Sequence, residues 1–154
     1  MISNLFPDGS VTIAGAEAKG LRELVELAQS SSLKRARFLL HRSTDDMPQV
    51  MLIFLERESV VEMHRHPSNK AEIYVVLEGQ LEVSFRESET GPEQIIILGP
   101  WGNKLGQPSL SLHRDSVWHQ PKSLTPYALY LELYSGPFSK DLDVEYLQEP
   151  SQRR

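Results

Sequence analysis

The chain has 154 residues, of which 40% are hydrophobic and 24% charged, and its formal net charge is -5. That length fits one domain that can bury a stable hydrophobic core without cross-links. The absence of cysteine excludes disulfides, thiolate metal sites and cysteine nucleophiles. The only basic run is the short KRAR at Lys34 to Arg37, which argues against nucleic acid as a partner.

The sequence contains no signal for export or membrane insertion. Its start, MISNLFPDGSV, lacks the cationic residues and the long apolar run of a signal peptide. The longest apolar stretch, Val50 to Leu55, is too short to cross a bilayer. We therefore expect a cytoplasmic protein with no membrane partner.

The first predicted element is a helix over residues 16–31, AEAKGLRELVELAQSS. Leu21, Leu24, Val25 and Ala28 recur at the three- and four-residue spacing of an amphipathic helix. The opposite face is charged, so we expect the apolar face of this helix to pack on one side of a sheet.

After Ser32 the pattern changes to short runs rich in β-branched and aromatic residues, separated by proline, glycine and aspartate turns. Many short strands at regular spacing indicate a sandwich or barrel. In the run near His113 we expect Leu110 and Leu112 to face the core and His113 the opposite side. The predicted strands are residues 36–42, 49–56, 60–66, 72–77, 80–85, 94–98, 110–115 and 127–134, followed by an irregular or partly helical tail.

The stretch VEMHRHPSNKAEIYVVLEG carries a candidate metal site. Because successive side chains of a strand alternate faces, His64 and His66 point the same way, about 7 Å apart along the strand. A turn at Pro67 to Asn69 lets Glu72 begin the returning strand beside the histidines, and Gly79 suits the tight turn at its other end. Two imidazoles and a carboxylate therefore converge on one point.

Such a site needs one more donor, and the remaining histidines are His41, His113 and His119. His119 is the strongest candidate, because it precedes Pro121 and a long predicted strand. It is therefore expected at a strand end in the barrel wall, from which its side chain could reach the same interior point. Three imidazole nitrogens and one carboxylate oxygen fit zinc, iron, nickel or manganese, so the expected cofactor is one divalent transition metal ion. No dedicated acid or base stands out.

This arrangement resembles the cupin superfamily, whose first motif has a His-x-His pair, a glutamate and a glycine, matched by His64, His66, Glu72 and Gly79. Of the second cupin motif, only the histidine, His119, is clearly present in this sequence. More narrowly, the chain resembles the WbuC family of cupin-fold metalloproteins over about residues 35–150. That likeness rests on HRHPSNKAEIYVVLEGQLEV, VWHQPKSL and LELYSGPFSKD.

The resemblance implies a mainly β fold, a double-stranded β-helix or jelly-roll barrel with an N-terminal helix. It divides the chain into an N-terminal segment with one helix at 1–32, a cupin barrel at 33–138 and a C-terminal tail at 139–154. It also implies a homodimer. The metal ligands it implies are His64, His66, Glu72 and His119.

Three hypotheses for function stay open. The first, implied by the family's association with surface-polysaccharide gene clusters, is an isomerase, epimerase or lyase acting on a small carbohydrate-related or carboxylate substrate. The second is a metal-dependent cupin dioxygenase, and the third is a non-catalytic module that binds a sugar or another small ligand. The sequence alone does not decide between an enzyme and a binding protein. The candidate pocket for a sugar or an anionic ligand comprises Gln49, Tyr74, His113 and Arg37.

Overall fold

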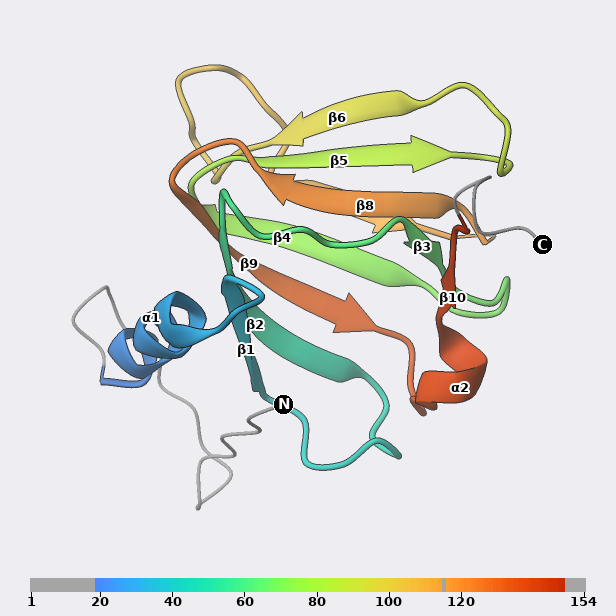
Figure 1. Ribbon diagram of the computed structural model, residues 1–154, viewed down its shortest axis with the longest axis horizontal. Helices are drawn as coiled ribbons and strands as arrows, with labels where there is room; N and C mark the ends of the chain where they lie inside the picture. The colour runs from blue at the N-terminus through green and yellow to red at the C-terminus, as the bar shows by residue number, and fades with distance from the viewer. Residues whose placement is uncertain (1–18, 115, 149–154) are drawn as a thin grey trace.

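The computed structural model describes residues 19–114 and 116–148, which form two five-stranded antiparallel sheets packed face to face, with two helices (Figure 1). Sheet A has the strand order β1 (Arg35–Leu39), β2 (Gln49–Glu56), β9 (Tyr127–Tyr134), β4 (Glu72–Glu78) and β7 (Leu110–His113). Sheet B has the order β10 (Glu145–Tyr146), β3 (His64–Arg65), β8 (Trp118–Ser123), β5 (Leu81–Arg86) and β6 (Gln94–Leu98). The helices are α1 (Lys19–Ser30) and α2 (Lys140–Asp143). The expected mainly β architecture is confirmed.

The N-terminal helix packs on the outer face of sheet A, over β1 and β2 (Figure 1). Leu24 and Ala28 are fully buried there, in contact with the cluster that contains Phe38 of β1. The expected helix is thus confirmed from Lys19 onward, and its predicted first turn, 16–18, lies outside the described residues. Neither described helix is long and apolar enough to cross a membrane.

The main apolar core lies between the two sheets. Along β4 the side chains that point into it run from Glu72 through Tyr74 to Val76, and each is at most 2% exposed. The interior therefore changes from polar at the start of β4 to apolar at its end. The apolar part is formed by Met51, Ile53, Leu55, Leu81, Val83, Leu98, Ala128 and Tyr130.

The side chains of β7 point in the opposite direction from the one expected. Leu110 and Leu112 are 51% and 42% exposed, whereas Ser111 is buried and His113 faces the interior beside Tyr74. The expectation that the two leucines face the core is wrong, because alternation fixes which residues share a face and not which face is inside. β7 is an edge strand, which leaves its outer side chains open to solvent.

The sequence pattern does not predict β8, because this strand contains Pro121 and mostly polar neighbours. Proline lacks the amide proton that a sheet ladder needs, and it is tolerated where a strand has an open side. Of the predicted strand 60–66 only β3 forms, and it pairs with β8 at His64 and His119 alone. β8 therefore has an open side at Pro121, and His119 lies near the start of a strand.

Gly79 makes the tight turn between β4 and β5. Its φ is +77°, a conformation that residues with a Cβ rarely adopt. A Cβ at this position would also collide with the carbonyl oxygen of Tyr127 and lie 2.7 Å from Oγ1 of Thr125. The turn therefore needs glycine for two separate reasons.

We expect Gly79→Ala to lower the free energy of unfolding by about 2 to 4 kcal/mol, because it combines backbone strain with a collision against backbone. Gly102→Ala is the matched control, since Gly102 has φ +75° and no atom within 4 Å of an added Cβ. That control should cost only about 1 kcal/mol. Urea denaturation measures both values, and equal losses would contradict the packing argument.

Candidate metal centre

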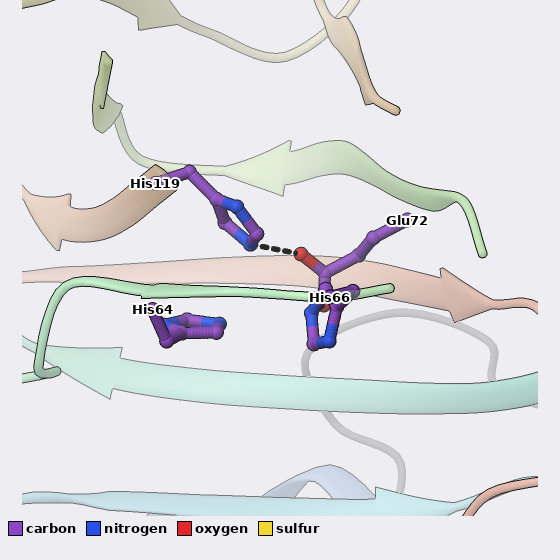
Figure 2. A group of neighbouring side chains, drawn as sticks. All are labelled: His64, His66, Glu72 and His119. Carbon is purple, nitrogen blue, oxygen red and sulfur yellow. Dashed lines mark ion pairs between the residues drawn. The ribbon is translucent and has the colours of Figure 1, made fainter. Parts of the chain in front are cut away.

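Four side chains from both sheets meet at the polar end of the interior (Figure 2). His64 lies in β3 and His66 directly follows it, while His119 lies in β8 and pairs with His64 through the backbone. Glu72 opens β4 in the facing sheet A. One possible ligand atom from each residue lies within 4.8 Å of those of the other three. The structure thus brings together the four residues that the sequence singles out.

The distances within this group suit a shared ion. Oε2 of Glu72 lies 2.7 Å from Nε2 of His119, and Oε1 lies 3.4 Å from Nε2 of His66. The ring centroid of His64 is 4.4 Å from that of His119 and 5.3 Å from that of His66. Glu72 and His119 are only 2% and 1% exposed, so water does little to stabilise a charge on either. His64 alone of the four is half-buried.

All three imidazoles use the same nitrogen to contact the backbone. Each Nδ1 lies within hydrogen-bond distance of a carbonyl oxygen, and a carbonyl oxygen can only accept. Nδ1 is therefore the protonated nitrogen, and each neutral ring keeps a free lone pair on Nε2, the atom available to a metal ion. The acceptors are Glu62 for His64, at 2.8 Å, Asp143 for His66, at 2.6 Å, and Val117 for His119, at 2.9 Å.

Several polar atoms of the centre are buried and unsatisfied. Oε2 of Glu72 and Nε2 of both His66 and His119 have no hydrogen-bond partner among the described residues. Two acceptors at 2.7 Å, such as those of His119 and Glu72, repel each other unless a proton or a cation lies between them. A divalent cation would satisfy these atoms together, so the residues fit a metal ion and this group could hold one.

Burial and neighbouring groups set the protonation of the metal-free centre. Burial opposes ionisation of Glu72. When the imidazoles of His119 and His66 carry a proton on Nε2 in place of a metal ion, their hydrogen bonds to the carboxylate outweigh burial and hold the pKa of Glu72 well below its usual range. Burial, assisted by the charge of His119, lowers the pKa of His64 to about 4. Near neutral pH Glu72 is therefore an anion and His64 is neutral, which are the forms that bind a metal ion.

Two of the four candidate pocket residues adjoin the centre directly. His113 stacks on His119 with ring centroids 4.8 Å apart and planes inclined by 12°. The ring of Tyr74 is 5.1 Å from that of His113 and 6.2 Å from that of His119. Both side chains therefore line the same polar end of the interior as the histidine and glutamate group.

The other two candidate pocket residues differ in their surroundings. Arg37 lies on β1 with Nη1 3.8 Å from the sulfur of Met51, a member of the interior core. Gln49 is 2% exposed, and its amide nitrogen donates to the carbonyl oxygens of Ser43 and Asp46, at 2.9 and 2.8 Å. The side chain of Gln49 therefore holds the loop before β2.

Glu132 is an acidic residue of the interior that the sequence analysis does not single out. It lies on β9 opposite Tyr74. Burial and the charge of Glu72 raise the pKa of Glu132 well above its usual value, and the charge of Arg37 opposes this shift. The sequence feature that could have indicated Glu132 is its place in YALYLELY. It is the one charged residue at the alternate positions that face inward, and the others are Ala128, Tyr130 and Tyr134.

A family model described as a domain of unknown function, DUF6016, matches residues 16–96. No curated protein sequence matches the chain significantly.

Solved structures similar to this chain include cupin-fold proteins. Protein SO0799 from Shewanella oneidensis has a TM-score of 0.63 and 15% sequence identity, covering 80% of this chain and 82% of that one. Capsular polysaccharide assembling protein CapF from Staphylococcus aureus has a TM-score of 0.58 and 15% identity over 75% of this chain, which spans only 32% of CapF. KdgF from Halomonas sp. has a TM-score of 0.50 and 18% identity, covering 73% of this chain and 87% of its own. CapF and KdgF are cupin-fold proteins, so the predicted cupin barrel is confirmed as a fold.

Proposed function

The chain belongs to the DUF6016 family, a domain of unknown function, and we propose that it is a cupin-fold metalloprotein with one divalent transition metal ion. The observation that carries the proposal is the convergence of imidazole nitrogens and a carboxylate, buried and without hydrogen-bond donors, at one point. Such acceptors are costly inside a protein, and a cation removes that cost. The proposed ligands are His64, His66, Glu72 and His119.

A ligand set of imidazoles and one carboxylate suits zinc, iron, nickel or manganese. The bound ion would supply Lewis-acid polarisation of a substrate oxygen. Around it, Tyr74 and His113 offer hydrogen-bonding groups that can orient a substrate, and Glu132 offers a carboxyl group for proton exchange. Proton transfer beside a polarised oxygen is the chemistry that isomerases, epimerases and lyases share.

The proposed substrate is a small carbohydrate-related or carboxylate compound. Arg37 provides a positive charge near Glu132, and the neighbouring hydroxyl and imidazole groups suit the oxygens of a sugar or an acid. The likeness to CapF, described as a capsular polysaccharide assembling protein, and the WbuC-type motifs both support a role in polysaccharide metabolism, which we propose to be cytoplasmic.

We expect the protein purified without added metal to contain close to one transition metal ion per chain. The double variant His64→Ala, His66→Ala should contain almost none, because it loses two of the four ligands. Plasma mass spectrometry measures both. The matched control is Glu87→Ala with Lys104→Ala, two exposed positions outside the centre. Equal metal in the two double variants would contradict the proposed site.

The same preparations test whether the metal stabilises the fold and which kind of function the protein has. A chelator should lower the stability of the wild type by about 2.7 kcal/mol at a metal concentration 100 times the dissociation constant, and it should not affect the histidine double variant. Thermal denaturation measures this loss. Iron together with oxygen uptake would point to a dioxygenase, and saturable sugar binding without turnover would point to a binding module.

We also propose that the protein is a homodimer that pairs through β6, β7 and the loop between them. Both strands are sheet edges, so their outer backbone groups are open to another strand. A second copy suits this surface because the exposed apolar side chains carry no charge and an identical copy presents the same apolar surface. These side chains are Ile95, Ile97, Trp101, Leu105, Leu110 and Leu112.

We expect the double variant Ile97→Glu, Leu112→Glu to be a monomer, since two such surfaces would repel each other. The control is Leu33→Glu, which places the same charge at a residue that is 57% exposed in the turn after α1. This control should stay dimeric. Sedimentation equilibrium measures the mass of each, and a monomeric wild type would contradict the dimer.

A further inference from the structure

Two of the three histidines of the centre are oriented by the backbone just before them in the chain, and the third is not. His64 and His119 each bond through Nδ1 to the carbonyl of the residue two positions earlier. His66 instead donates to the carbonyl of Asp143, 77 positions later in the chain, at 2.6 Å. This hydrogen bond is buried, so the orientation of the His66 ring depends on where the C-terminal segment lies.

Backbone pairing holds that segment beside the strand that carries the histidines. β10 pairs with β3 at two positions, one of which places Tyr146 opposite His64. The amide of Leu147 also donates to the carbonyl of Met63, at 2.9 Å. Figure 1 shows α2 and β10, in red, next to β3. β3 pairs with β8 at one position, so backbone pairing holds it on both sides, with β10 along one edge and β8 along the other.

Asp143 fixes the short helix α2 through its side chain. This residue is 5% exposed, and Oδ2 accepts a hydrogen bond from the amide of Ser139, at 2.8 Å. The same oxygen lies 3.7 Å from Nζ of Lys70. The carboxylate thereby places the Asp143 carbonyl, which His66 requires, at a defined position.

Lys70 connects the C-terminal segment to the turn between two proposed ligands, His66 and Glu72. Its ammonium group donates to the carbonyl of Ser135, at 3.1 Å, and to that of Pro137, at 2.5 Å. Both carbonyls belong to the chain that leaves β9 toward α2. The ammonium group of Lys70 therefore joins the turn between His66 and Glu72 to the segment that orients His66.

We propose that residues 138–147 hold His66 in place as a metal ligand, with Lys70 and Asp143 as the positioning residues. This inference rests on the proposed metal site. Loss of the outer hydrogen-bond partners of a ligand weakens metal binding by about 10- to 100-fold. Because coupling between two binding events is reciprocal, the metal in turn stabilises the contact of the C-terminal segment with β3.

Cobalt(II) titration of the full chain, followed by visible absorption, tests this role. Asp143→Ala and Lys70→Met should each weaken cobalt binding about 10-fold or more and alter the spectrum of the bound ion, since ring orientation changes the ligand geometry. Asp141→Ala and Lys140→Met remove the same charges from exposed positions of α2 and should change neither. Asp143→Asn keeps an acceptor for Ser139, so it should fold and lose less affinity than Asp143→Ala.

Hydrogen exchange gives a second readout. Cobalt should slow exchange of the Leu147 amide in the wild type and have no such effect in His66→Ala. Unchanged affinity and spectrum in both Asp143→Ala and Lys70→Met, or Leu147 exchange that does not respond to cobalt in the wild type, would overturn the positioning role. The metal site itself fails separately, if the His64→Ala, His66→Ala variant binds cobalt as tightly as the wild type.

Discussion

The approach of Nε2 of His119 to Oε2 of Glu72, at 2.7 Å, is the contact on which the polar half of the interior depends. It joins sheet B to sheet A at a depth where water reaches neither group. Desolvation of a carboxylate is expensive, and a buried charge without a partner would destabilise the fold. The contact is therefore favourable only with a shared proton or cation, a requirement that a bound metal ion could meet.

Packing in the apolar part of the barrel stabilises a fold that contains such a buried polar centre. Inward-facing residues of β4 pass from Glu72 to Val76 within one strand, and the buried cluster around Val76 and Val83 keeps the sheets at a fixed separation. The same sheet contact that buries apolar surface also brings the candidate ligands of opposite sheets together. Stability and site geometry thus come from different parts of one interior, and the histidine and glutamate group lies at the end where β4 begins.

The parts of the centre that the sequence predicts depend on local geometry. Alternation along one strand places His64 and His66 on one side, and the length of the following turn returns Glu72 to them. The fold class follows from the number and spacing of short strands. The tight turn after the strand that begins at Glu72 follows from Gly79. The faces of β7 could not be predicted, because alternation is symmetrical until long-range pairing decides which side is inside.

Glu132 and Asp143 show why the groups around the candidate ligands cannot be predicted from the local sequence pattern. Glu132 is recognisable as an interior carboxyl only once the pairing of β9 with β2 and β4 has fixed which of its residues face inward. Asp143 contributes its backbone carbonyl to His66, and every residue type possesses that group. Residue types can therefore identify candidate metal ligands, whereas the groups that orient those ligands depend on which backbone the fold places beside them.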